Sequence, residues 1–270
     1  MGSAGAAANG NGSRAAAQVF EIPIDLGPPA DVLRAITGWA RNGDRAGAPK
    51  RVMYANAHVL NQSVEVPELR GILGGADLVY CDGYGVRVAA RALGVQEPHR
   101  MTGADWVWGL ASICEAQGIS LYLLGSEPGT ARQASARLRR WHADLQVVGA
   151  HHGYFQPGTP HNERVLEDIN QRRPNILLVG MGSPKQELWV DRYADRLDVD
   201  ILWTVGALFD YVSGRVPRAP RWVADNGLEW IFRLGLEPQR MWRRYLLGNP
   251  VFLSRVVAET RRRRAMAPQA

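Results

Sequence analysis

Cysteine is scarce in this sequence, and long hydrophobic runs are missing. Only Cys81 and Cys114 occur among 270 residues, which excludes a disulfide framework and a cysteine-based zinc site and indicates a reducing compartment. Apolar runs, such as the one around residues 205–209, are far shorter than the roughly 20 residues that span a bilayer. We therefore expect no transmembrane helix.

Lysine is also rare, and the positive charge is unevenly distributed. Lys50 and Lys185 are the only lysines, so nearly all of the 32 basic residues are arginines, and the net charge is +6. Residues 215–264 contain 12 arginines and only 4 acids. The whole positive excess therefore lies in the last fifth of the chain.

The overall composition is that of a globular protein, since 46% of the residues are apolar and 21% are charged. Residues 1–17 are mostly alanine, glycine, serine and asparagine and lack the apolar core of a secretory signal. We expect a disordered leader at 1–17, a catalytic core at 18–214, a helical appendage at 215–262 and a disordered tail at 263–270.

Short apolar runs alternate with stretches of helical length through the core. Continuous apolar strands separated by helices predict an α/β fold with a mostly parallel sheet covered on both faces. In such sheets ligands bind outside the carboxyl ends of the strands. The expected strands are 52–55, 78–81, 121–125, 146–150, 176–180 and 201–205, and the expected helices are 29–41, 85–93, 105–117, 129–141, 162–172 and 185–196.

The appendage has a different character, because tryptophans and arginines interleave and prolines divide it into short helices. Arginine suits phosphate groups, and tryptophan favours the interface of a bilayer. We expect this segment to dock on an anionic membrane surface and the core to fold without it. Self-association could also cover its apolar face.

Two strand ends carry polar residues that chemistry could use. Asp82 lies in "CDGYG", where a carboxylate beside glycines can act as a general base or can cap the next helix. Asn56 lies in "NAHVLNQS", where its amide can cap a helix or bind a substrate hydroxyl. The residues alone leave both alternatives open.

Glycine turns at two further strand ends favour a phosphorylated ligand. "LLGSEPG" and "LLVGMGSPKQE" both enter helices, whose first N–H groups attract phosphate, and Lys185 could add a contact. Neither string is a dinucleotide fingerprint or a Walker A loop.

Two other strings are unpromising as metal sites. His151 and His152 directly follow the expected strand at 146–150, and because adjacent residues of extended chain point apart, we expect their side chains to do so. The "DVD" string at 198–200 precedes its strand and so lies at the wrong end of the sheet. We expect no metal site.

Together these strings resemble the WecG/TagA/CpsF glycosyltransferase family, glycosyltransferase family 26, over residues 22–253. The resemblance implies a Rossmann-like core of the GT-E type. It also implies transfer from a UDP-sugar to a polyprenyl-diphosphate-linked saccharide, with inversion, without metal or other cofactor, at the inner face of a bacterial membrane. The matching strings are "NAHVLNQS", "ADLVYCDGYGV", "RMTGAD", "LYLLGSEPG", "HHGYF", "LLVGMGSPKQELW", "VGALFDYVSGRVPRAPRW" and "GLEWIFRLGLEPQRMWRRYLLGNP".

The resemblance also implies roles for individual residues. Asp82 falls on the catalytic base, with Asn56 and Arg100 beside it in the active site, and Tyr54 departs from the threonine that the family often has. The residues that fall on nucleotide- or donor-binding positions are Thr102, Gly103, Gly125, Ser126, Tyr154, Gly180, Gly182, Lys185, Gln186 and Asp210, and those that fall on acceptor-diphosphate positions are Arg233, Arg240 and Arg243.

Two other function classes compete with this interpretation. A nucleotide-dependent oxidoreductase could use the same sheet, although its glycine fingerprint is absent. A nucleic-acid-binding protein could use the arginine-rich segment, with aromatic side chains stacking on bases. We rank both below the transferase and expect no nucleic-acid partner.

Overall fold

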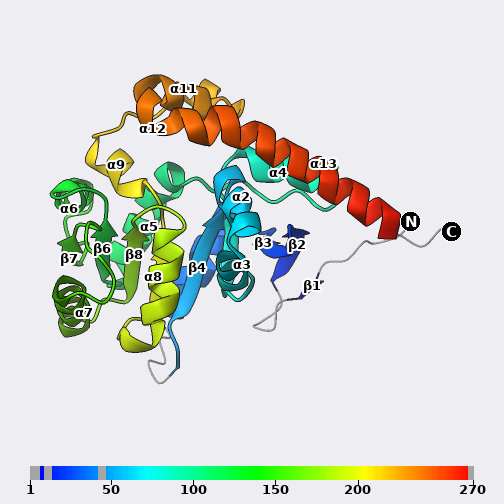
Figure 1. Cartoon of the computed structure of the whole chain (residues 1–270). Coiled ribbons are helices and arrows are strands. Elements are labelled where there is room, and N and C mark those ends of the chain that lie inside the picture. Colours follow the sequence, from blue (N-terminus) through cyan, green and yellow to red (C-terminus); the bar gives the residue numbers. More distant parts are fainter. Residues whose placement is uncertain (1–6, 9–13, 42–46, 267–270) are drawn as a thin grey trace.

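The computed structural model describes residues 7–8, 14–41 and 47–266. A six-stranded parallel sheet forms its centre, in the order β5-β4-β9-β8-β6-β7 (Figure 1). Most of its strand residues are buried, as expected for a sheet covered on both faces. The predicted α/β fold is therefore confirmed. The strands are β4 (Lys50–Ala55), β5 (Leu78–Cys81), β6 (Leu121–Gly125), β7 (Val147–His151), β8 (Ile176–Gly180) and β9 (Ile201–Thr204).

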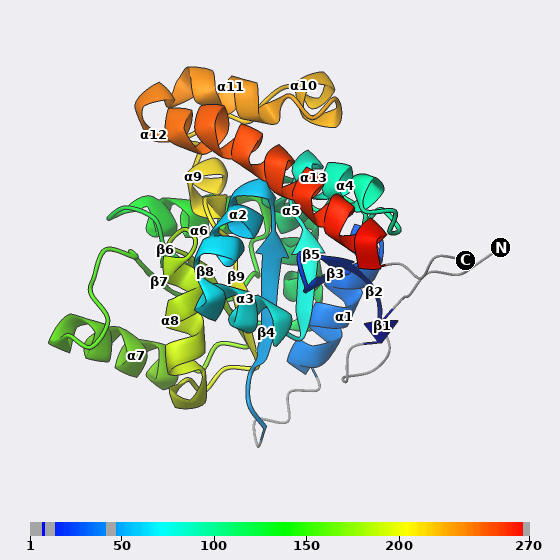
Figure 2. The ribbon, with the colours of Figure 1, turned by 45° about the vertical axis from the view of Figure 1, so that its right-hand side comes forward.

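Helices cover both faces of the sheet because the chain crosses the sheet in both directions, and right-handed crossovers in opposite directions place their helices on opposite faces. In Figure 2, α2, α3 and α8 lie in front of the sheet and α5 lies behind it. The front face carries α2 (Ala57–Glu65), α3 (Pro67–Gly74), α7 (Pro160–Arg172) and α8 (Lys185–Tyr193), and the opposite face carries α1 (Pro29–Arg41), α5 (Gly103–Gln117) and α6 (Thr130–Trp141). Two further helices, α4 (Tyr84–Ala92) and α9 (Leu208–Ser213), follow β5 and β9.

A small antiparallel sheet precedes the core and changes one expected boundary. It consists of β1 (Ala7–Ala8), β2 (Ala15–Val19) and β3 (Ile22–Asp25). Strand β2 begins inside the segment expected to be a disordered leader, and Ala16 and Ala17 are buried. Their small side chains carry no strand pattern, so pairing with β3 was not visible in the sequence. The rest of the expected leader, at 1–6 and 9–13, lies outside the described residues.

The C-terminal segment is helical, as predicted, and most of it lies over the carboxyl end of the sheet. Its helices are α10 (Arg221–Asp225), α11 (Glu229–Leu236) and α12 (Pro238–Trp242), followed by a π-helical turn (Arg243–Leu247) and α13 (Gly248–Met266). Pro250 cannot donate to the carbonyl one α-turn earlier, and the wider π turn lies just before it. The chain therefore stays helical through Pro250, where the sequence favoured a break.

The last helix returns to the core rather than standing apart from it. In Figure 1, α13 runs along α2 and α4 toward the N-terminal sheet. Phe252 is buried, and its ring meets that of Phe20 edge-on at a centroid distance of 6.0 Å. Arg255 donates to the Asn61 carbonyl at 2.7 Å and pairs with Glu65 at 2.8 Å. We therefore no longer expect residues 1–214 to fold alone.

The end of α13 also changes the expected tail. The helix continues to Met266, and Arg263 donates to the Gln18 carbonyl at 3.0 Å. Residues 263–266 of the expected disordered tail are therefore helical, and 267–270 lie outside the described residues. Across the described ranges, no helix combines the length and the apolar character that crossing a bilayer requires.

Candidate active site

A cavity of about 1340 Å³ lies between the carboxyl end of the sheet and the C-terminal helices. The loops after all six strands of the sheet contribute to its lining, as do α11, α12, the π turn and the start of α13. All but two of the site residues predicted from the sequence line it. The exceptions are Gly125 and Gln186.

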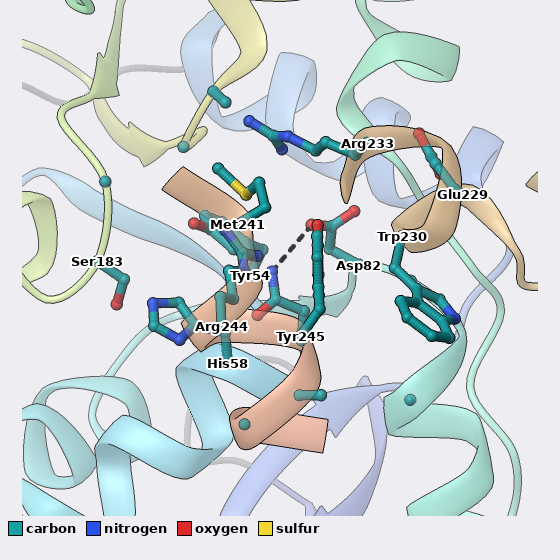
Figure 3. A pocket seen from close by; sticks show the side chains of 18 of the residues that line it. Tyr54, His58, Asp82, Ser183, Glu229, Trp230, Arg233, Met241, Arg244 and Tyr245 are labelled. Atoms are coloured by element: carbon teal, nitrogen blue, oxygen red, sulfur yellow. Dashed lines mark hydrogen bonds between the residues drawn. The ribbon is translucent and has the colours of Figure 1, made fainter. Parts of the chain in front are cut away.

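Asp82 and Asn56 meet in this cavity. Asn56 Oδ1 accepts a hydrogen bond from the Val59 N–H at 3.0 Å, so the asparagine caps α2. Its Nδ2 also donates to Asp82 Oδ2 at 3.3 Å, the bond drawn dashed in Figure 3. Of the two alternatives that the sequence left open for Asn56, the structure shows the helix cap, and the same amide also orients the Asp82 carboxylate.

The surroundings of Asp82 make its carboxylate a stronger base than an exposed one. Burial raises the pKa of Asp82 above its ordinary value, while the Asn56 hydrogen bond and the charges of Arg244, Arg100 and Arg233 oppose that rise. Figure 3 shows the carboxylate facing the cavity near Arg233 and Glu229. A partly enclosed base with cations on several sides suits proton abstraction near a negatively charged ligand.

Arg100 lies where the loop before α5 passes β5. Its backbone forms a bridge with Cys81, which fixes the arginine beside Asp82. Its guanidinium approaches Thr102 Oγ1 at 3.4 Å and a carboxylate oxygen of Glu229 at 3.8 Å. Glu229 was not predicted from the sequence; burial, and then the charge of Asp82, raise the pKa of its carboxyl.

The predicted donor residues line the other side of the cavity. Lys185 Nζ donates to the Gly153 carbonyl at 2.6 Å, beside Tyr154, whose side chain is exposed. Gly180 must be glycine, because an added Cβ would lie 2.7 Å from the Gly206 carbonyl oxygen. The remaining donor residues that line the cavity are Thr102, Gly103, Ser126, Gly182 and Asp210.

Gly125 and Gln186 lie behind the residues that line the cavity and support them. An added Cβ on Gly125 would lie 2.2 Å from the Gly180 carbonyl oxygen, so this glycine permits close packing of two strand ends. Gln186 is fully buried, accepts a hydrogen bond from the Gly206 N–H at 3.1 Å and donates to Glu187 at 2.7 Å. Gln186 thus shapes the turn after β9, and the expected contact with a diphosphate is not supported by its position.

The three predicted acceptor arginines differ in their surroundings. Arg233 is buried and lies over the ring of Tyr211 at 5.3 Å. Arg240 is exposed, and its guanidinium lies 3.9 Å from the Asp210 carboxylate. This ion pair links a predicted acceptor residue, Arg240, to a predicted donor residue, Asp210. Arg243 is exposed and lies over the ring of Trp242 at 5.2 Å.

Arg244 is a site residue that the sequence analysis missed. Its side chain is half-buried, and its Nε is enclosed without a hydrogen-bond partner among the described residues. Its charge opposes the rise in the pKa of Asp82, and after burial it is the next cause that lowers the pKa of His58, to about 4. An enclosed guanidinium nitrogen that lacks a partner is suited to an anionic ligand. The adjacent arginines in "MWRRYL" were the available signal; both line the cavity, and the structure shows that Arg244 is the more enclosed of the two.

The histidines of "HHGYF" contradict the expectation that their side chains point apart. His151 is the last residue of β7, and its ring centroid lies 4.4 Å from that of His152. His161, from the first turn of α7, joins them, and one ligand atom from each residue lies within 4.8 Å of the others. Burial, and then the charge of His151, lower the pKa of His152 and His161.

The acidic string at 198–200 lies at the amino end of β9, away from the cavity lining. Asp198 pairs with Arg173 at 2.8 Å, and Asp200 accepts a hydrogen bond from the Asn175 amide at 2.7 Å. These acids therefore take part in local structure.

Comparison with known proteins agrees with this geometry. Residues 17–266 match the Glycosyl transferase WecG/TagA/CpsF family, so the match extends from strand β2 through the end of helix α13. It includes both the sheet that carries Asp82 and the helices that close the cavity. The chain belongs to the WecG/TagA/CpsF family of glycosyltransferases.

Proposed function

We propose that this glycosyltransferase moves a hexose-type sugar from a UDP-sugar to a polyprenyl-diphosphate-linked saccharide, with inversion and without a metal ion. Family membership supports a transferase of cell-surface polysaccharide synthesis. The observation that carries the finer proposal is the partly enclosed Asp82, held by Asn56 in a cavity that also contains arginines from the C-terminal helices.

In this mechanism Asp82 takes the proton of the acceptor hydroxyl while the hydroxyl oxygen attacks the anomeric carbon. The bond to UDP breaks on the opposite side of the sugar, so one displacement inverts the configuration. Lys185 and the N–H groups at the starts of the helices after β6 and β8 can stabilise the departing diphosphate. Arg233, Arg240 and Arg244 can bind the acceptor diphosphate.

A donor screen tests the proposal. Purified protein is incubated with individual UDP-sugars and a short-chain polyprenyl-diphosphate-saccharide, and UDP release is measured. One donor should give release that depends on the acceptor. If no donor in the screen gives UDP release, and the protein also does not bind UDP, the proposal is contradicted.

Turnover at saturating donor should persist in excess EDTA. The residues that line the cavity can neutralise a diphosphate with arginine, lysine and helix N-termini, so a divalent cation is not needed for that step. The measurement is kcat before and after chelation, with EDTA-treated protein resupplied with Mg²⁺ as the control. Loss of turnover that Mg²⁺ or Mn²⁺ restores would show a metal-dependent mechanism.

The C-terminal helices should bind anionic membranes through arginines and exposed apolar side chains. Polybasic attraction is worth about 1 kcal/mol per arginine and is screened by salt, whereas inserted aromatic side chains resist salt. Vesicle binding should therefore weaken, but persist, as salt rises. The exposed apolar side chains on these helices include Trp222, Leu228, Ile231, Leu236, Trp242, Leu246, Leu247, Val251, Leu253 and Val257.

A matched pair of tryptophans tests this membrane contact. Trp222 on α10 is 69% exposed and Trp141 on α6 is 72% exposed. Trp222→Ala should weaken vesicle binding by about tenfold, and Trp141→Ala should leave it unchanged. Equal effects of the two changes, or a dimer in solution that shields Trp222, would contradict membrane docking by this face.

A further inference from the structure

The His151, His152 and His161 cluster lies beside the cavity but outside the reaction site. None of the three histidines lines the cavity that contains Asp82. His151 ends β7, His152 follows it, and His161 lies in the first turn of α7, so the cluster joins the two ends of the loop that carries Tyr154. All three side chains are partly exposed, which leaves them accessible to an ion from solution.

The distances between the imidazoles match those of a metal site. His151 Nε2 and His161 Nε2 lie 3.4 Å apart. Two nitrogens bound to tetrahedral Zn²⁺ at its usual bond length lie roughly 3.4 Å apart. His151 Nδ1 donates to the His152 carbonyl at 2.8 Å, so the lone pair on His151 Nε2 faces the N–H of His161 Nε2, and an ion bound between the two nitrogens would replace that proton. Backbone carbonyls support metal-bound histidines in the same way.

His152 must change its hydrogen bonding to join such a site. Its Nδ1 accepts a hydrogen bond from the Tyr154 N–H at 3.1 Å. If His152 binds the ion through Nδ1, the ion replaces that N–H; if it binds through Nε2, Nδ1 carries a proton and can no longer accept. Either route releases the Tyr154 backbone amide.

We propose that His151, His152 and His161 bind a first-row divalent cation, with Zn²⁺ the best match, and that binding releases the Tyr154 amide. Three neutral imidazoles suit Zn²⁺, and water can complete a tetrahedral site. The ion fastens the end of β7 to the first turn of α7. It takes no part in the transfer step, so this proposal stands apart from the proposed function.

Zinc binding to untagged, chelator-treated protein tests the site. Equilibrium dialysis should give one zinc per chain, and Co²⁺ should give the intense visible absorption of four-coordinate cobalt. Loss of an outer partner alone weakens a metal site by about 10–100-fold, so His151→Ala and His161→Ala should weaken zinc binding at least as much. His99→Ala, at an exposed histidine outside the cluster, is the control.

Amide hydrogen exchange tests the link to Tyr154. With zinc bound, exchange at the Tyr154 amide should become faster, while metal-free protein keeps its protection. Circular dichroism of the metal-free variants checks that each folds. The site is disproved if no stoichiometric zinc binds, or if His151→Ala and His161→Ala bind zinc as the unsubstituted protein does. Zinc binding with unchanged exchange at Tyr154 would show that His152 is not a ligand.

Discussion

Asp82→Asn should reduce turnover by roughly 10² or more, the usual scale for losing a general base, while UDP binding stays within about twofold of that of the unsubstituted protein. Asparagine keeps the size of the side chain but cannot accept the proton of the acceptor hydroxyl. Stopped-time assays of UDP release and calorimetric titration with UDP measure the two effects. Turnover close to that of the unsubstituted protein would remove Asp82 from the proposed role.

Stability gives this variant an internal control. Burial raises the pKa of Asp82 in the folded state, so the free energy of unfolding falls as the pH rises from the ordinary aspartate pKa to that raised pKa, and the full penalty is present above it. Asp82→Asn should therefore keep or raise Tm at neutral pH. A lower Tm together with lost activity would show damage to the fold rather than loss of a base.

The same pKa predicts the acid limb of the pH profile. Activity requires ionised Asp82, so kcat/KM should fall as pH drops through a pKa above the ordinary aspartate value. The Asn56 hydrogen bond lowers this pKa, so its removal should move the acid limb to higher pH. Asn56→Ser is the suitable change, because serine can still cap α2 while it removes the amide donor.

Arg244→Ala should reduce kcat/KM for the lipid-linked acceptor by about 10–100-fold, since hydrogen bonds to charged groups are worth about 1.5–3 kcal/mol. UDP binding should change little, because Arg244 lies among the C-terminal helices. Initial rates at varied acceptor concentration measure the effect. Arg244→Lys should restore only part of it, because lysine lacks the planar fork of donors.

Arg243→Ala is the matched control for this prediction. The two arginines are adjacent and both line the cavity, but Arg243 is exposed and lies against Trp242, whereas Arg244 is half-buried. We expect less than a threefold change from Arg243→Ala, on the scale of exposed substitutions. A larger effect from Arg243 than from Arg244 would support the role that the sequence resemblance implies for Arg243.

Local patterns in the sequence predicted the parts of the site that follow strands. Asp82 and Asn56 each come directly after a buried strand, and parallel strands bring their carboxyl ends to one edge of the sheet. Lys185 begins a helix after a glycine turn, which is also a local pattern. To predict these placements it is enough to know that the strands run parallel.

The parts that the sequence could not predict depend on contacts between distant elements. The choice between Arg243 and Arg244 depends on a π turn, whose extra residue changes the direction of every later side chain. His161 meets His151 only because α7 begins close to the end of β7. Strand β2 is a run of alanines whose pairing needs β3, so composition alone indicated a disordered leader.

Helix α13 also constrains when the protein can complete its folding during synthesis. It covers α2 and the aromatic side chain of Phe20, yet it follows every other described element in the sequence and so leaves the ribosome after them. Until then α2 and the N-terminal sheet lack their partner, and the arginine-bearing π turn is joined to the core at one end only. A nascent chain can thus form its central sheet early, while its cavity is completed only once α13 has been synthesised and has packed.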